Sequence, residues 1–342
     1  MRRRGRAVRA LAALCYVALL VWSLTTVTGF TQRRSISVLC SSIEDSCRAW
    51  ARGFTDETGI EVAMVRASTG EALARLSRAD ASRDFDVWHG GGADVYEIAR
   101  ARGLLAAYHS PNAAAVPARF ADAEGYWTGT YLGVLGFCSN VRILDRLGVG
   151  VPATWDDLLD PRLAGQVSIP SPVTSGTGYT VLWTNWLRLG ADERALGDYL
   201  RAVDANVLQY TASGLAPARV AGHGEVAVAV GFTQHCVKAQ QEGFTDLVVS
   251  YPPGGAGFEV GAVAVLAGAR DRQGAERYVD YALSRSAQLS GADTHSVQLP
   301  TRRDLAVDPR LGGGVALLDY SVEQAAAARE ALTALFRSEV HR

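Results

Sequence analysis

Short apolar runs alternate with helix-length segments along this chain, and no other feature of the sequence constrains its fold as strongly. Residues 35–39 and 60–65 have the length and composition of strands, and apolar side chains recur at helical spacing over 42–58 between them. A helix at 71–79 and a strand at 85–88 continue the order. The alternation predicts an α/β fold in which mainly parallel strands are covered by helices.

The same pattern starts again in the second half of the chain. In order, the predicted elements are a strand at 165–169, a helix at 176–189, a strand at 226–232, a helix at 234–242, strands at 247–250 and 261–266, and helices at 274–284 and 321–338. Two such sections predict two lobes, joined by strands that cross near 133–139 and 259–265. We assign residues 35–135 and 262–342 to lobe 1 and residues 136–261 to lobe 2.

The first 34 residues have the layout of an export signal. Five arginines lie within residues 2–9, and residues 10–32 carry no charge and are mostly apolar. A run of this length is also just long enough to span a bilayer. Residues 1–34 are therefore predicted to be a cleaved signal peptide or, through residues 7–32, a membrane anchor. Either outcome places the rest of the chain in the periplasm or elsewhere outside the cytoplasm.

The remainder of the chain is acidic. Seven of the 34 Lys and Arg and none of the 35 Asp and Glu lie in the first 34 residues, which leaves 27 basic against 35 acidic side chains, a net charge of −8. An acidic body without a basic tract argues against a nucleic-acid partner. Its length of about 310 residues is enough for two domains.

Four cysteines follow the leader: Cys40, Cys47, Cys138 and Cys236. In an oxidising compartment an even number suggests disulfides, and Cys40 with Cys47 and Cys138 with Cys236 are the candidate pairs. The alternative is four small buried hydrophobic side chains. No CxxC or HxxxH spacing is present, so no structural zinc site is predicted.

Hydroxyl-rich and glycine-rich turns follow the predicted strands. In residues 168–180 (SIPSPVTSGTGYT) a strand runs into Thr174, Ser175, Gly176 and Thr177, which precede an apolar helix. Hydroxyls and free N–H groups at a helix N-terminus suit an anion such as phosphate. Plain N-capping by Ser or Thr is the alternative.

Three further turns have the same character. They are Ser41-Ser42 after the first strand, the glycine run that contains Gly91, and residues 209–217 with Thr211 and Ser213. Successive glycines can turn their N–H groups toward a ligand, although a tight strand-to-helix turn would use them equally. The run lacks GxGxxG and GK[ST], so a nucleotide site is not supported.

Charged and titratable candidates for a site are few. Glu259 lies beside the second crossing, and Gln234 and His235 follow the strand that ends at Phe232. A lone histidine often has a structural role instead. No GxSxG elbow, assignable Ser/His/Asp set or paired carboxylates are present, so no enzyme is predicted.

Several segments, taken in order, resemble one family. They are Val87 to Pro111 (VWHGGGADVYEIARARGLLAAYHSP), Trp127 to Tyr131, Trp155 to Gly165 (WDDLLDPRLAG), the TSGTGYT and QYTASGLAPA stretches, and Gly257 to Gly261. They are similar to stretches of the periplasmic solute-binding proteins of the ferric-ion, phosphonate and sugar-phosphate transport group, and the likeness covers residues 35–320. It implies a two-lobed type II periplasmic-binding-protein fold that closes on ligand at a hinge, an ABC importer permease as partner, and a monomer without a cofactor.

The resemblance also guides the choice of ligand. Ferric-ion binders of that group hold the metal with adjacent tyrosines, whereas the corresponding positions here, Tyr210-Thr211 or residues 232–234, offer no tyrosine pair for a metal that prefers anionic oxygens. The chain looks more like the phosphonate and hexose-phosphate branch, although that branch often has His-Asp where this chain has Gln234-His235. The implied ligand-binding residues are Ser41, Gly91, Thr174, Ser175, Gly176, Thr177, Thr211 and Ser213 for the anion, and Gln234, His235 and Glu259 for the rest of the solute.

We therefore predict a solute-binding protein for a small phosphorylated or phosphonate solute, with no metal site. A ferric-ion-binding protein is the alternative within the class. A membrane-anchored ligand-sensing input of a signalling system is the alternative from another class, and an enzyme ranks third.

Overall fold

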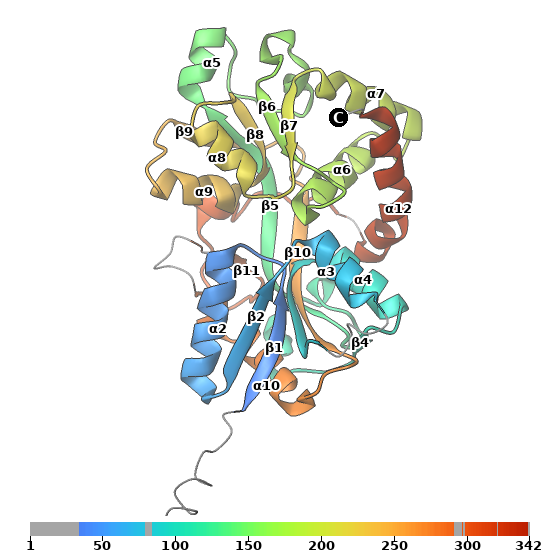
Figure 1. Cartoon of the computed structure of the whole chain (residues 1–342). Coiled ribbons are helices and arrows are strands. Elements are labelled where there is room, and N and C mark those ends of the chain that lie inside the picture. The colour runs from blue at the N-terminus through green and yellow to red at the C-terminus, as the bar shows by residue number, and fades with distance from the viewer. Residues whose placement is uncertain (1–33, 79–83, 291–295, 297, 320, 341–342) are drawn as a thin grey trace, which may run out of the picture. The chain divides into compact units, whose positions relative to one another are not determined.

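Strands and helices alternate along the chain in the computed structural model, which describes residues 34–78, 84–290, 296, 298–319 and 321–340 (Figure 1). The strands are β1 (Ser35–Cys40), β2 (Glu61–Arg66), β3 (Val87–Gly92), β4 (Leu105–Ala106), β5 (Thr128–Asn140), β6 (Val167–Pro170), β7 (Val207–Thr211), β8 (Val228–Phe232), β9 (Leu247–Ser250), β10 (Phe258–Leu266) and β11 (Leu299–Pro300).

The α-helices begin with α2, the first one in the described residues. They are α2 (Glu44–Thr58), α3 (Thr69–Leu76), α4 (Ala93–Ala101), α5 (Val141–Leu147), α6 (Gly176–Arg188), α7 (Glu193–Asp204), α8 (Ala216–Gly222), α9 (Thr233–Gln241), α10 (Arg272–Ala282), α11 (Arg285–Gln288) and α12 (Val322–Glu339). Short 3-10 turns lie at Pro111–Ala115, Ala118–Phe120, Asp156–Leu159, Pro161–Leu163 and Pro309–Leu311.

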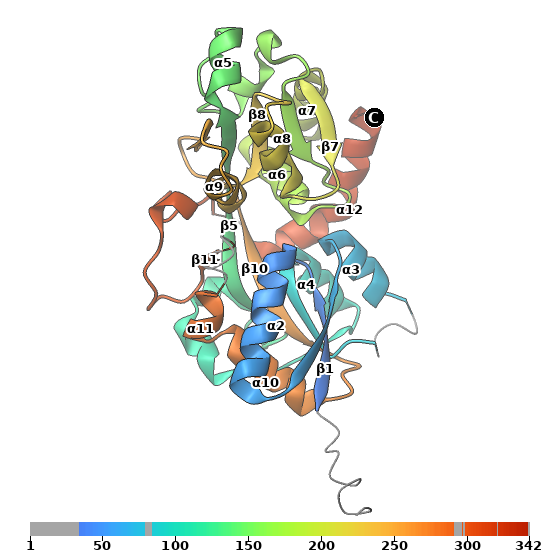
Figure 2. The ribbon, with the colours of Figure 1, turned by 60° about the vertical axis from the view of Figure 1, so that its left-hand side comes forward.

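The strands run in the order β2-β1-β3-β10-β5-β8-β6-β7, and the long strand β5 joins two halves of this sheet. Residues 128–134 of β5 pair with β10, and residues 135–140 pair with β8 and β9. We call the part built on β1–β4, β10 and β11 the first half and the part built on β6–β9 the second half. Figures 1 and 2 show β5 passing from one to the other beside β10.

The predicted α/β class is confirmed, and the sheet is mixed. β1 pairs in parallel with β2 and β3, and β6 pairs in parallel with β7 and β8, as expected for strands that are followed by helices. The crossing strands β5 and β10 run antiparallel to their neighbours because each returns from one half toward the other.

Each half has its own hydrophobic core. Trp88, Tyr96 and Tyr278 are fully buried in the first half, and Phe137 and Leu158 are fully buried in the second. A further cluster lies where α12 packs on α6 and α7. Because α12 also packs on α4 of the first half, the C-terminal helix contacts both halves.

Several elements, α5 among them, were not expected from the sequence. Helix α7 lies in a stretch for which no element was predicted, and residues 209–217, expected as a polar turn, begin inside β7. β7 is an edge strand with Leu208 and Gln209 exposed, so it lacks the apolar run that marked the other strands.

Both candidate cysteine pairs are disulfides in the structure. Cys40 at the end of β1 is bonded to Cys47 in α2, and Cys138 in β5 is bonded to Cys236 in α9. The alternative of four free buried thiols is therefore excluded. Among the described residues no helix is both long and apolar enough to cross a membrane. The predicted signal peptide or anchor, residues 1–34, lies outside those residues except for Arg34.

Candidate ligand-binding site

A cleft of about 220 Å³ lies between the two halves. From the first half it is lined by Ser41, Ser42, Ile43, Arg66, Ala67, Ser68, Thr69, Glu71, Tyr131, Glu259 and Gln298. From the second half it is lined by Thr174, Ser175, Gly176, Thr177, Ala212, Ser213, Gly214, Leu215, Phe232, Gln234 and His235. Most of these residues lie at the end of a strand, in the turn that follows it, or in the first turn of the next helix.

The N-termini of five helices reach this cleft. Lining residues occupy the N-cap or the first turn of α2, α3, α6, α8 and α9. No side chain caps the start of α2 or α9, so their first backbone N–H groups keep their hydrogen-bonding capacity. At the start of α8 the Ala216 N–H donates to the Ser213 carbonyl oxygen and Pro217 has no N–H. Free N–H groups and the positive ends of helix dipoles together favour a bound anion.

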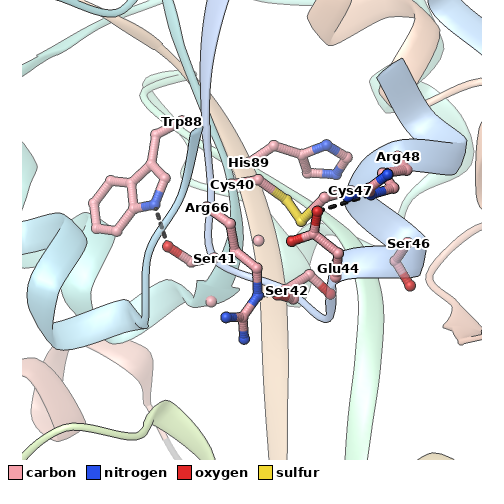
Figure 3. Close-up of a disulfide and its surroundings, with 12 residues drawn as sticks. Cys40, Ser41, Ser42, Glu44, Ser46, Cys47, Arg48, Arg66, Trp88 and His89 are labelled. Carbon is pink, nitrogen blue, oxygen red and sulfur yellow. Dashed lines mark hydrogen bonds and ion pairs between the residues drawn. A yellow bond between two sulfur atoms is a disulfide. The ribbon is translucent and has the colours of Figure 1, made fainter. Parts of the chain in front are cut away.

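Serine hydroxyls in the cleft are oriented as donors. Ser41 Oγ accepts a hydrogen bond of 2.9 Å from the Trp88 indole N–H, as Figure 3 shows. Ser175 Oγ accepts from the backbone N–H of Gly178, and Ser213 Oγ accepts from that of Leu215. Because each oxygen already accepts from the protein, each hydroxyl hydrogen remains available to a ligand oxygen.

Arg66 is the one arginine or lysine side chain that lines the cleft in the described part of the chain. It lies at the end of β2 and reaches the turn at Ser42, as Figure 3 shows. Its Nε–H donates to the carbonyl oxygen of Ser42 at 2.8 Å. This hydrogen bond joins the turn after β1 to the turn after β2. The rest of its guanidinium places a positive charge beside the uncapped start of α2.

The interior of the cleft is largely uncharged. Burial raises the pKa of Glu259 to about 8, and the nearby Asp94 carboxylate adds to this rise while Arg329 opposes it. Burial likewise raises the pKa of the Tyr131 hydroxyl. At pH 7 both groups are therefore mainly protonated and can donate hydrogen bonds.

Two residues of α9 present acceptors to the cleft. His235 Nδ1 lies 2.9 Å from the carbonyl oxygen of Gly214, so Nδ1 carries the hydrogen and Nε2 is an acceptor. Burial lowers the pKa of His235 to about 4, which keeps the ring neutral. Gln234 Oε1 is buried and has no hydrogen-bond partner among the described residues. An unsatisfied buried oxygen beside a cleft indicates a donor on the ligand.

Most of the predicted ligand-binding residues lie on this cleft. Nine do so: Ser41, Thr174, Ser175, Gly176, Thr177, Ser213, Gln234, His235 and Glu259. Gly91 and Thr211 do not line it. The Gly91 N–H donates instead to the Tyr131 hydroxyl at 3.1 Å, and the Thr211 hydroxyl donates to the carbonyl oxygen of Ser213. Both residues thus position a lining residue.

Several lining residues were not predicted. Arg66 and Thr69 follow a predicted strand and precede a helix, so the signal that identified Ser41 could have found them. Tyr131 lies inside β5 and Gln298 lies beside β11, far from any strand-to-helix turn. No local pattern marks either, because each reaches the cleft through the pairing of distant strands.

The described residues contain no group of three or more His, Cys, Asp and Glu side chains that could hold a metal ion. Tyr210, in one of the two stretches compared above with the ferric-ion binders, packs its ring against Phe336 with a centroid distance of 5.2 Å and does not line the cleft. Within the described ranges, Tyr131 is the tyrosine that does. This donor set suits an oxyanion better than iron(III).

The chain is similar in sequence and in fold to several known proteins. Residues 89–325 match the family model described as bacterial extracellular solute-binding protein. An uncharacterized protein of Haemophilus influenzae is 33% identical over 298 residues, 85% of each chain. A protein of Salmonella typhimurium named as a putative 2-aminoethylphosphonate-binding periplasmic protein is 25% identical over 77% of each chain. The structure of the periplasmic binding protein AfuA from Actinobacillus pleuropneumoniae with fructose-6-phosphate bound has a TM-score of 0.83 and 31% identity, and the match covers 90% of this chain and 99% of that one.

Proposed function

Because this chain belongs to the family of bacterial extracellular solute-binding proteins, we propose that it is the extracytoplasmic binding component of an ABC importer. Its ligand is a small solute that carries a phosphate or phosphonate group. The observation that carries this proposal is the convergence of helix N-termini, those of α2 and α9 without a side-chain cap, and several serine hydroxyls on one cleft. The names of two similar proteins, for 2-aminoethylphosphonate and fructose-6-phosphate, support the ligand class.

Neutral donors hold the oxyanion in this proposal. Ser41, Ser175, Thr177 and Ser213 supply hydroxyls, the helix starts supply N–H groups, and Arg66 adds one positive charge at the rim. These donors act at contact distance, whereas the net negative charge of the body is screened within about 10 Å at moderate salt. An acidic protein can therefore bind an anion in this cleft.

Closure of the two halves traps the ligand. β5 and β10 pass between the halves and supply the hinge. The proposed lobes remain residues 35–135 with 262–342 and residues 136–261, although α12 contacts both halves. The membrane permease of the importer recognises the closed form. We further propose that the protein acts as a monomer and without a nucleic-acid partner.

Iron(III) is the competing ligand, since Tyr131, Glu71 and Glu259 bring three oxygen ligands to the cleft. A thermal-shift experiment on the purified protein separates the two, because a ligand of the native state raises Tm. We expect 2-aminoethylphosphonate or fructose 6-phosphate to raise Tm and ferric citrate to leave it unchanged. A rise with iron alone, or with none of these compounds, would refute the proposal.

Thr177→Val tests the anion subsite directly. Thr177 lies in the first turn of α6 on the cleft, and valine keeps its shape while removing the hydroxyl. Loss of a hydrogen bond to a charged ligand costs roughly 1.5–3 kcal/mol, so affinity should fall by about 10- to 100-fold in isothermal titration. Thr184→Val is the matched control, because the Thr184 hydroxyl donates to the Thr180 carbonyl within α6 and lies outside the cleft. Equal effects of the two substitutions would argue against an anion at Thr177.

A further inference from the structure

Three titratable side chains from distant parts of the chain lie together behind the cleft. Glu259 lies on β10, Asp94 in the first turn of α4, and Arg329 in the middle of α12. Glu259 is 6% exposed, and the side chains of Asp94 and Arg329 are 13% and 11% exposed. Glu259 also lines the cleft, so this buried cluster adjoins the ligand site.

Two glycines allow the carboxylates to lie close together. A Cβ atom on Gly92 would lie 2.4 Å from Asp94 Oδ1 and 3.2 Å from Glu259 Oε2. A Cβ atom on Gly176 would lie 2.7 Å from Glu259 Oε2. The Glu259 carboxyl group is therefore enclosed between the end of β3 and the start of α6, with Asp94 as its neighbour.

The positive charge of Arg329 acts on both Asp94 and Glu259. The Arg329 guanidinium forms an ion pair with Asp94 and lies 4.1 Å above the Tyr179 ring. Glu259 has no ion-pair partner within the described ranges. The other titratable groups that influence Glu259 are the hydroxyls of Tyr96 and Tyr131, which are uncharged. A buried carboxylate beside a second acid is costly, so Glu259 must hold a proton or be neutralised by a cation.

Other acceptors that line the same cleft indicate which cation. Gln234 Oε1 is buried without a partner among the described residues, and His235 presents Nε2 as an acceptor. Together with a Glu259 carboxylate these groups form a set of acceptors. An ammonium group offers three N–H donors and one positive charge, which matches that set.

We infer that Asp94 and Arg329 are positioning residues that make Glu259 bind either a proton or the ammonium group of a ligand. A solute that carries an ammonium group as well as an oxyanion then binds in exchange for one proton. The proton passes to the buffer, and the Glu259 carboxylate pairs with the ammonium group. This inference rests on the proposed function for the identity of the cleft. The pKa of about 8 for Glu259 supports it, because the carboxyl group is then mainly protonated at pH 7 in the empty protein.

Infrared difference spectroscopy tests the positioning role without any ligand. The band of a protonated buried carboxyl group should disappear on titration near pH 8, and it should be absent from Glu259→Gln at every pH. Arg329→Met should move this midpoint upward, because Asp94 then lacks its counter-charge, and Asp94→Asn should move it downward. A merely structural role would leave both midpoints at the wild-type value, which would overturn the inference. If Arg329→Met does not fold, the double variant Asp94→Asn/Arg329→Met, which leaves no unpaired charge, should show a midpoint between those of wild type and Asp94→Asn.

Calorimetry with 2-aminoethylphosphonate tests the exchange. Titrations at pH 7 in two buffers of different ionisation enthalpy give the number of protons released. Wild type should release close to one proton more than Glu259→Gln, since ionisation of the ligand contributes equally to both. Ethylphosphonate, which lacks the ammonium group, should bind more weakly and show no such difference.

Equal proton release by the two proteins, or equal affinity for the two phosphonates, would overturn the exchange. Binding of fructose 6-phosphate with no binding of 2-aminoethylphosphonate would overturn it as well while leaving the proposed function intact. If no phosphorus compound binds, the proposed function fails, and the infrared titration still decides the role of Asp94 and Arg329.

Discussion

Glycines at the start of α6 allow this helix to pack closely against the end of β6 beside the cleft. Gly176 is the first residue of this helix, and Gly178 follows it one residue beyond Thr177. A Cβ atom on Gly178 would lie 2.5 Å from the backbone oxygens of both Pro170 and Ser171. Backbone atoms cannot move aside as the end of a side chain can, so the close packing of α6 on the end of β6 depends on this glycine.

Gly178→Ala should therefore destabilise the protein. Forcing one extra methyl group into a well-packed site typically costs about 1–3 kcal/mol in the free energy of unfolding. Urea titration of the variant gives this value. Gly150→Ala is the matched control, because a Cβ atom there would meet nothing within 4 Å and should leave the unfolding free energy nearly unchanged. A Gly178→Ala protein as stable as Gly150→Ala would contradict the packing argument.

At the scale of elements, both disulfides fasten a helix start at the cleft to the strand beside it. The Cys40–Cys47 bridge joins the end of β1 to α2, and the Cys138–Cys236 bridge joins β5 to α9 (Figure 3 shows the first). α2 and α9 are also two of the helices whose starts carry no side-chain cap. The bridges hold these helix starts in place where no capping side chain does so.

The two bridges should differ in how much they stabilise the fold. Their cysteines are 7 and 98 residues apart, and a longer closed loop removes more entropy from the unfolded chain. The chain-entropy relation gives roughly 2 kcal/mol for the short loop and roughly 5 kcal/mol for the long one. Urea unfolding of Cys40→Ala/Cys47→Ala and of Cys138→Ala/Cys236→Ala measures the difference. A larger loss from the first pair would contradict loop entropy as the dominant contribution.

At the scale of the whole molecule, a buried lysine connects the two halves beside the cleft. Lys238 in α9 forms an ion pair of 3.0 Å with Asp45 in α2 and contacts the Ser296 hydroxyl. The Lys238 side chain is 4% exposed, whereas Asp45 is 43% exposed. If the two halves open and close as proposed, opening would break this pair, so the pair should favour the closed form.

Lys238→Met should shift this balance toward the open form. A partly exposed ion pair contributes up to about 1 kcal/mol, which corresponds to roughly a fivefold change in population. Small-angle X-ray scattering of the ligand-free protein should then give a larger radius of gyration. Arg142→Met removes the exposed pair with Asp246 inside the second half and should leave the radius unchanged. An unchanged radius for Lys238→Met would show that the pair does not hold the halves together.

Buried titratable groups predict how the stability of the whole molecule depends on pH. Burial lowers the pKa of His89 to about 3 and that of His235 to about 4, so the unfolded chain binds more protons than the folded protein below about pH 6.5. Stability should then fall as the pH decreases, by about 1.4 kcal/mol per pH unit for each histidine. Glu259 has the opposite sign, because its folded-state pKa of about 8 exceeds the value of 4.5 for a free side chain, and its contribution is lost as the pH rises toward 8.

The free energy of unfolding should therefore have a maximum near pH 6.5. Urea titrations at pH 5.5, 6.5 and 8 locate it. In Glu259→Gln the decline between pH 6.5 and 8 should disappear, while the decline below pH 6.5 should remain. The same decline above pH 6.5 in both proteins would show that Glu259 does not hold a proton in the folded state.

The order of strands and helices, and most of the anion subsite, could be predicted from the sequence because both depend on neighbours in the chain. Periodicity over a few residues decides whether a segment becomes a strand or a helix, and the turn between them carries its own hydroxyls to the end of the strand. Thr174 to Thr177 and Ser41 lie on the cleft for this reason. The edge strand β7 was not predicted, because its burial pattern depends on its pairing with β6, which is distant in sequence.

Only the tertiary structure decided which groups from distant segments meet. Strand pairing brings Tyr131 into the cleft. Its hydroxyl accepts the hydrogen bond of the Gly91 N–H, which we had predicted from the sequence to bind the ligand. Asp94, Glu259 and Arg329 likewise come from three separate elements, and their charges matter to one another only because folding removes the water between them. Local sequence patterns determine elements and their caps, whereas the dielectric environment and the charge balance of a site exist only once the chain is packed.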